Sequence, residues 1–237
     1  MTTTVVAVIP ALNEEDAIGG VVRGLLAELP QLATVFVVDN GSTDRTGVRA
    51  AEAGAQVVSE PRRGYGRACL AGVRAASSAD IVLLLDGDGA DDTSGALSVL
   101  EPLLAGRADL SVGTRVAGDR EAGSMTPQQL LGNRLAAAIL RRKYSLGVSD
   151  PGPLRAIRRE MLLAMGMTEM SYGWTIEMTA KAARLGLRYV EVPVTYRRRV
   201  GRSKVGGTLH GSVGAGISIL VALWRCRNWE PVGAATW

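Results

Sequence analysis

The stretch that most constrains the fold is a short apolar run that ends in a cluster of aspartates. Residues 81–85 read Ile-Val-Leu-Leu-Leu, and four aspartates occur in the seven residues that follow. An unbroken apolar run of this length, bounded by turn-forming residues, predicts a strand that is buried on both faces. We therefore expect this strand to lie at the centre of a sheet that helices cover on both sides.

Asp86 and Asp88 follow this strand directly. The two-residue period of a strand predicts that both side chains point to the same side, while Gly87 and Gly89 leave space for a ligand. Two carboxylates at the end of a buried strand are costly to desolvate unless a cation or hydrogen-bond donors compensate them. A divalent ion bound to a substrate diphosphate would compensate both. The alternative is an acidic turn that caps the next helix, which fits one aspartate better than four.

Apolar runs alternate with helical patterns through the first half of the chain. Strands are predicted over 4–10, 34–39, 55–59, 81–85 and 110–114, with helices between them. This alternation predicts an α/β fold, namely a doubly wound, mostly parallel sheet with helices on both faces. Ligands bind at the carboxyl edge of such sheets. The residues at that edge are Asn13, Glu14, Asp39, Asp86, Asp88 and Arg115.

The second half departs from this rhythm. We expect a loop over 116–126, a helix over 127–146, a turn and short strand over 150–158, a helix over 173–185, an edge strand over 189–196, a basic loop over 197–207 and a C-terminal helix over 208–225. Pro193 favours the edge position of the last strand, because proline lacks the amide that a second neighbour would need. With no repeat or linker visible, a single domain over 1–237 is expected, with a nucleotide-binding half over about 1–115 and an acceptor half over about 116–237.

The net charge of +4 is concentrated in three basic clusters, at 141–143, 197–199 and 202–204. Nucleic acid is not expected as a partner, because aromatic residues make up only 4 % of the chain and offer few stacking platforms. A phosphorylated substrate or an anionic membrane surface fits these clusters better. The two cysteines have no metal-binding spacing and no signal peptide is visible, which indicates a cytoplasmic protein with reduced thiols.

Four motifs follow one another along the chain: Pro10-Ala11-Leu12-Asn13-Glu14-Glu15, Val38-Asp39-Asn40-Gly41-Ser42-Thr43-Asp44, Gly64-Tyr65-Gly66-Arg67-Ala68 and Asp86-Gly87-Asp88. In this order they resemble the motifs of family 2 glycosyltransferases with the GT-A fold. Downstream, Glu191-Val192-Pro193-Val194 with Arg198, Gly201, Ser203 and Lys204 is similar to dolichol-phosphate mannose synthase-like members, which are polyprenyl-phosphate glycosyltransferases. One departure is Asp150-Pro151-Gly152-Pro153-Leu154-Arg155, where many polyprenyl-phosphate enzymes have Ser-Gly-Phe-Arg.

The resemblance implies an inverting transfer of a sugar from a nucleotide-sugar, UDP rather than GDP, with Mg²⁺ or Mn²⁺. Asp39 would accept from the base, or instead begins an Asx turn. Asp86 would contact ribose or sugar hydroxyls, and Asp88 would bind the metal. The implied nucleotide-sugar-binding residues are Pro10, Ala11, Leu12, Glu14, Asp39, Gly64, Gly66, Asp86, Gly87, Asp88, Arg115, Arg198, Ser203 and Lys204.

A hydroxyl acceptor would require a general base on the face opposite the diphosphate. Asp150 is the first candidate and Glu177 the second, although Asp150 also suits a turn before proline and Glu177 the first turn of a helix. A lipid-phosphate acceptor is already ionised and needs no base, so Asp150 would then orient or bind. Arg115, Arg134, Arg155 and the 198–204 loop are candidate anion clamps.

The apolar C-terminal helix, which arginines follow, predicts contact with the inner face of a membrane or with a second copy in a homodimer. Two other functions were weighed. A sugar-nucleotide pyrophosphorylase would have a glycine-rich phosphate loop where this chain has Pro-Ala-Leu-Asn-Glu-Glu at 10–15. An inactive nucleotide-binding relative is disfavoured because Asp86, Asp88 and Asp150 are retained.

Overall fold

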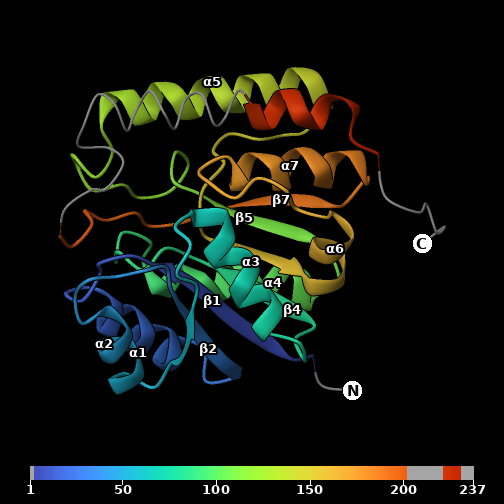
Figure 1. Cartoon of the computed structure of the whole chain (residues 1–237). Coiled ribbons are helices and arrows are strands. Elements are labelled where there is room, and N and C mark those ends of the chain that lie inside the picture. Colours follow the sequence, from blue (N-terminus) through green and yellow to red (C-terminus); the bar gives the residue numbers. More distant parts are fainter. Residues whose placement is uncertain (1–2, 202–220, 231–237) are drawn as a thin grey trace.

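Seven strands form one sheet within residues 3–201 and 221–230, the parts of the chain that this computed structural model describes (Figure 1). Their order across the sheet is β3-β2-β1-β4-β6-β5-β7, and β6 alone runs antiparallel to its neighbours. The predicted mostly parallel sheet is therefore confirmed. The strands are β1 (Val5–Ala11), β2 (Leu32–Asp39), β3 (Gln56–Ser59), β4 (Ile81–Leu84), β5 (Leu110–Thr114), β6 (Arg155–Arg158) and β7 (Tyr189–Pro193).

Helices cover both faces of the sheet, as expected. One face carries α1 (Ile18–Glu28), α2 (Thr46–Glu52) and α4 (Ala96–Leu104), which follows the short 3-10 turn η1 (Thr93–Gly95). The other carries α3 (Tyr65–Ala75), α6 (Arg159–Ala164) and α7 (Trp174–Arg184). A further layer packs on α7 and consists of α5 (Pro127–Tyr144) and residues 221–226, which lead into η2 (Cys226–Asn228) (Figure 1).

The strand β1 explains why the sheet needs two helical layers. All seven of its residues are buried. Ala7 and Ile9 pack into the core beneath α1 and α4, whereas Val6 and Val8 pack into the core beneath α3. This is the two-residue period of a strand that is apolar on both faces. Because β1 pairs in parallel with β2 and β4, the polar residues that follow these strands meet at one edge of the sheet.

Several element bounds differ from those predicted. The helix predicted between the strands at 4–10 and 34–39 does not follow the first strand directly but begins at Ile18, because Asn13 adopts a positive φ of 51° and residues 12–17 form a loop. The helix α6 follows β6 directly and was not predicted. β7 lies at the sheet edge, as Pro193 indicated, but ends at that proline.

The predicted C-terminal helix over 208–225 falls mostly outside the described residues, and residues 221–225 of it are helical. No helix among the described residues is long and apolar enough to span a bilayer.

Candidate functional site

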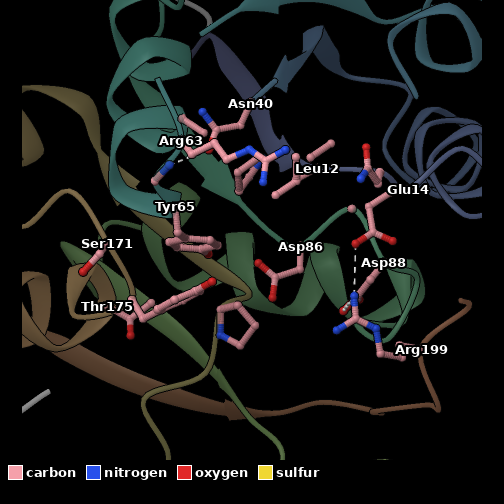
Figure 2. A pocket seen from close by; sticks show the side chains of 18 of the residues that line it. Leu12, Glu14, Asn40, Arg63, Tyr65, Asp86, Asp88, Ser171, Thr175 and Arg199 are labelled. Atoms are coloured by element: carbon pink, nitrogen blue, oxygen red, sulfur yellow. Dashed lines mark hydrogen bonds and ion pairs between the residues drawn. The ribbon is translucent and has the colours of Figure 1, made fainter. Parts of the chain in front are cut away.

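A pocket of about 730 Å³ opens at the carboxyl ends of β1 and β4 (Figure 2). Its walls come from the loop after β1, the start of α3, the turn after β4, and segments before and within α7. The predicted residues that line it are Pro10, Ala11, Leu12, Glu14, Gly64, Asp86, Gly87, Asp88 and Arg115. Lining residues that the sequence did not single out for this role include Asn40, Arg63, Tyr65, Gln129, Ser171, Tyr172, Thr175, Tyr196 and Arg199.

Asp86 and Asp88 both line this pocket, although β4 ends at Leu84 and the two aspartates sit in the turn beyond it. Asp88 accepts a hydrogen bond on Oδ1 from the amide of Ala90 at 2.9 Å. The Oδ1 of Asp86 is buried and has no hydrogen-bond partner among the described residues. Burial and the adjacent charge of Asp88 raise the pKa of Asp86 to about 7, against the opposing effects of the Tyr65 hydroxyl and nearby guanidinium groups.

The other two aspartates of the cluster have different surroundings. Asp91 is buried behind the pocket, 3.5 Å from the amide of Asp86 through its Oδ2, and burial raises its pKa well above the ordinary value. Asp92 accepts from the amide of Ser94 at 3.1 Å and begins the turn that leads into α4. The acidic-cap alternative therefore describes Asp92, while Asp86 and Asp88 face the pocket.

Arg199 is the basic residue that closes one side of the pocket (Figure 2). Its guanidinium lies 3.0 Å from Glu14 Oε1 and 3.4 Å from Asp88 Oδ2. The neighbouring Arg198, which the resemblance had implied, instead donates to the carbonyl of Ala122 at 2.8 Å and does not line the pocket. The sequence Arg197-Arg198-Arg199 does not indicate which of the three arginines reaches the pocket. Ser203 and Lys204 lie outside the described residues.

Arg115 and Asp150 form a buried, bidentate ion pair at the end of β5. The two side chains meet at 2.7 Å through Nε–Oδ2 and at 2.7 Å through Nη2–Oδ1, and the Arg115 amide also donates to Oδ2 at 3.0 Å. Asn133 donates to Oδ1 at 3.3 Å. Burial disfavours the charge of Arg115, but the Asp150 carboxylate outweighs this and raises the arginine pKa. Arg115 reaches the pocket, whereas Asp150 stands behind it with both oxygens engaged.

Glu177 is held away from the pocket by a dense set of donors. It accepts from the amide of Glu169 at 2.8 Å and from the hydroxyl of Thr168 at 2.7 Å, and it pairs with Lys181 at 2.8 Å. Burial alone would raise the pKa of Glu177, yet these donors lower it. The carboxylate thereby fixes the segment before α7, from which Ser171 reaches the pocket.

Asp39 takes the Asx-turn arrangement in this structure, accepting on Oδ1 from the amide of Ser42 at 2.9 Å, and it does not line the pocket. The next residue, Asn40, does line it. Asn40 donates to the carbonyls of Glu60 and Arg62 at 2.8 and 2.9 Å, and it accepts from the amide of Gly64 at 2.8 Å. It therefore joins the end of β2 to the start of α3, a role that an amide can fill because it both donates and accepts.

The glycines at the start of α3 serve packing. A Cβ at Gly66 would clash with the carbonyl of Glu169, and one at Gly64, whose φ is +149°, would clash with the carbonyl of Met170. Arg67 donates its amide to the same Met170 carbonyl at 3.3 Å. Both glycines were predicted to let the backbone approach a ligand. Only Gly64 lines the pocket, whereas Gly66 packs against Glu169 and Met170.

The donor set at the end of β4 fits a hard divalent cation. Asp86 and Asp88 offer carboxylate oxygens, the ligands that Mg²⁺ and Mn²⁺ prefer, and one of these oxygens is buried without a partner. Within the described parts of the chain, no group of three or more His, Cys, Asp or Glu side chains is arranged to hold a metal ion. A cation here would therefore need further ligands from water or from a bound diphosphate.

A pocket at the carboxyl edge of a mostly parallel sheet, lined by two aspartates and by arginines beside them, suits a nucleotide whose diphosphate carries a metal ion. The arrangement is that of the GT-A class of nucleotide-sugar-dependent glycosyltransferases. Residues 6–166 match the family model "Glycosyl transferase family 2", and the chain belongs to this family.

Relatives and solved structures agree with this assignment. An uncharacterized glycosyltransferase of Mycobacterium tuberculosis is 42 % identical over 211 residues, covering 88 % of this chain and 93 % of the relative. The undecaprenyl-phosphate mannosyltransferase of Micrococcus luteus is 30 % identical over 97 % of this chain and 98 % of its own. The crystal structure of glucosyl-3-phosphoglycerate synthase from Mycobacterium tuberculosis with Mn²⁺ and UDP-glucose superposes with a TM-score of 0.76 at 26 % identity, covering 98 % of this chain and 81 % of that one.

Proposed function

We propose that this glycosyltransferase transfers a sugar from a UDP-sugar, with inversion at the anomeric carbon, to an acceptor that carries a phosphate. The observation that carries the proposal is the pair Asp86 and Asp88, which lines one pocket together with Arg115 and Arg199. UDP is preferred over GDP because a solved neighbour of the same fold holds Mn²⁺ with UDP-glucose.

Asp88 is proposed to hold Mg²⁺ or Mn²⁺, which when bound supplies a Lewis acid that neutralises charge on the leaving diphosphate. Asp86 lines the pocket and would accept hydrogen bonds from ribose or sugar hydroxyls. Arg199 already lies against Asp88, so its guanidinium is placed to pair with an anionic group beside that carboxylate. Leu12 and Asn40 line the part of the pocket where a base would lie.

A phosphate acceptor agrees with the position of the carboxylates. Neither Asp150 nor Glu177 lines the pocket, so neither is placed to take a proton from a bound hydroxyl in this arrangement. An ionised phosphate needs no base, and Asp150 would instead hold Arg115 in position to bind it. Two relatives are named for lipid-phosphate products or acceptors.

We further propose that the nucleotide-binding half, about 1–115, and the acceptor half, about 116–237, act as one domain. A lipid-phosphate acceptor would place the protein at the cytoplasmic face of a membrane. The relatives that support this are the undecaprenyl-phosphate mannosyltransferase and the polyprenol monophosphomannose synthase of Mycolicibacterium smegmatis, which is 29 % identical over 96 % of this chain.

Calorimetric titration with UDP and GDP, each with and without Mn²⁺, tests the donor site. We expect UDP to bind only when the metal is present. The Asp88→Asn variant should stay folded but should no longer show this metal-dependent binding of UDP. Binding of neither nucleotide to a folded sample, or full transfer by Asp88→Asn, would overturn the donor assignment.

The acceptor is tested by incubating UDP-sugars with undecaprenyl phosphate, 3-phosphoglycerate and a simple alkyl alcohol. Transfer to undecaprenyl phosphate and not to the alcohol is expected, with NMR of the product showing an inverted anomeric centre. Transfer to 3-phosphoglycerate would use its hydroxyl and, like transfer to the alcohol, would require a general base. Transfer to the alcohol alone would return the search to a general base, and nucleotide binding without turnover on any acceptor would favour an inactive relative.

A further inference from the structure

The outer surface of α5 exposes large apolar side chains and arginines together. We propose that this surface docks onto an anionic membrane, with the helix lying in the plane of the lipid headgroups. The surface, called the α5 face below, consists of Leu131, Arg134, Leu135, Ala138 and Arg142. The proposal is independent of the donor chemistry, although a lipid-phosphate acceptor would give the docking its purpose.

Helix geometry places these residues on one side of α5. Positions 131, 135, 138 and 142 are spaced by four, three and four residues, which is the repeat of one helical face. The opposite side of the helix is buried, with Ala136, Ala137 and Leu140 packed in the core shared with α7. Leu131 is 70 % exposed and Leu135 is 55 % exposed. Two leucines one turn apart that are left in water beside an exposed alanine form an apolar strip that an apolar medium could cover.

The charge on α5 has one sign only. Between Pro127 and Tyr144 the helix has four basic residues and no acidic one. Within the described residues, neither Arg134 nor Arg142 has a hydrogen-bond or ion-pair partner, whereas Arg141 and Lys143 donate to the carbonyls of Val148 and Leu223. Exposed leucines flanked by free arginines are the pattern of a helix that lies in a membrane interface.

The segment beside the C-terminal end of α5 extends this pattern. Residues 221–226 pack against α5 and α7, and Trp224 is 62 % exposed there. Arg227 lies over the Trp224 ring at 5.0 Å. Tryptophan and arginine are residues favoured at the level of lipid headgroups, where an apolar ring and a charged tip are both accommodated.

The N-terminal end of the same helix borders the pocket. Gln129, in the first turn of α5, lines the pocket, and so does Tyr172, which is 47 % exposed. Gln129 shares the side of α5 that carries Ala136 and Leu140, so the α5 face points away from the pocket and a membrane there would contact the layer that covers α7.

Two other occupants fit the α5 face less well. A second copy bound through a twofold axis would bring together two patches that both carry arginines, with no acidic residue of α5 to compensate their charge. A nucleic acid would match the arginines but would gain nothing from the two leucines, since phosphate and sugar contacts are polar.

The test is co-sedimentation of the full chain with vesicles of phosphatidylcholine, alone or with about 30 % phosphatidylglycerol. Two variants change the face: Leu131→Gln/Leu135→Gln and Arg134→Gln/Arg142→Gln. Two matched controls change residues of equal type elsewhere: Leu97→Gln/Leu104→Gln on α4, which are 46 % and 43 % exposed, and Arg23→Gln/Arg74→Gln on α1 and α3. Calorimetric titration of every variant with UDP and Mn²⁺ measures nucleotide binding separately, so that a loss of membrane binding can be distinguished from damage to the donor site.

Binding is expected to anionic vesicles only, and to weaken between about 0.1 M and about 0.5 M salt, because salt screens the attraction. The arginine variant should lose about fivefold in partition for each arginine removed. The leucine variant should lose about tenfold or more. Both controls should bind as the parent chain does, and nucleotide binding should be unchanged in all four variants.

Equal losses in the face variants and the controls, or no vesicle binding at all, would overturn the proposal. So would retention of RNA in place of vesicles, which would assign the arginines to nucleic acid. A dimer that dissociates in the leucine variant, measured by analytical ultracentrifugation without lipid, would assign the face to self-association instead.

Discussion

Replacing Asp150 by asparagine separates two roles for this carboxylate, holding Arg115 or taking a proton. The Asp150 side chain is fully buried and that of Arg115 is 9 % exposed. Arg115 gives Asp150 three hydrogen bonds, two of them at 2.7 Å from the guanidinium. The Asp150→Asn variant keeps the shape of the side chain but leaves the buried guanidinium without a counter-charge.

The expected loss of stability follows from this geometry. Breaking one partner of a buried ion pair costs about 3–5 kcal/mol, because the remaining charge stays uncompensated. Asparagine retains one acceptor oxygen, so we expect about 3 kcal/mol. In a chain of this size each kcal/mol lowers Tm by about 2–4 °C, which gives a decrease of roughly 6–12 °C.

Thermal and denaturant unfolding measure this loss, and Glu52→Gln is the control at an exposed ion pair. Glu52 pairs with Arg49 at 3.1 Å, and the two side chains are 51 % and 48 % exposed, so the control should lose about 1 kcal/mol or less. The double variant Arg115→Gln/Asp150→Asn should be more stable than Asp150→Asn alone, because it removes the unpaired charge. A single variant as stable as the parent chain, or additive losses in the double variant, would refute the reasoning.

Kinetics then distinguish the two roles. If Asp150 positions Arg115, the variant should show a raised KM for a phosphate acceptor and an unchanged pH profile of kcat. If Asp150 were the base, kcat would fall about 10²–10⁴-fold with a lost limb in that profile. The second outcome would contradict the positioning role.

Three further predictions test other parts of the site. Gly66→Ala should lower stability by about 1–3 kcal/mol in unfolding experiments, because its Cβ meets the carbonyl of Glu169. Glu177→Gln should cost about 2 kcal/mol at pH 7. The pKa of Glu177 is lower in the folded state than its ordinary value near 4.5. Its ionised form therefore contributes to the free energy of unfolding above pH 4.5, and this contribution is lost as the pH falls through the folded-state pKa. The difference in Tm between variant and parent should accordingly shrink on acidification. Arg199→Ala should weaken UDP binding with Mn²⁺ by about tenfold in calorimetry, whereas Arg198→Ala should leave it unchanged.

The sequence was most informative where one local pattern decides the structure. The apolar run over 81–85 predicts a strand that is buried on both faces. In the structure β4 lies in the middle of the sheet and every residue of it is buried. Pro193 likewise restricts its strand to an edge, and β7 is the last strand. In both cases the residue types leave no competing arrangement of backbone hydrogen bonds.

The sequence was least informative where neighbouring residues of the same type compete. Arg198 and Arg199 have the same chemistry, and only the path of the chain beyond β7 turns Arg199 toward Asp88. The choice between Asp39 and Asn40 depends on the same kind of detail, because an Asx turn occupies Asp39 while Asn40 bridges to Gly64. The late start of α1 has a related cause. Asn13 adopts a left-handed conformation and accepts a hydrogen bond from the amide of Thr43, a contact between distant segments that the local sequence does not indicate.

The charges around the pocket account for the expected dependence of donor binding on a metal. Glu14, Asp86 and Asp88 all line the pocket, and Arg199 lies between Glu14 and Asp88. Arg115 is already neutralised by its own buried partner. Burial, and after it the neighbouring charge of Asp88, raises the pKa of Asp86. A nucleoside diphosphate alone would add further negative charge beside these carboxylates, so we expect its binding to need a cation in addition to the guanidinium groups of Arg63 and Arg199.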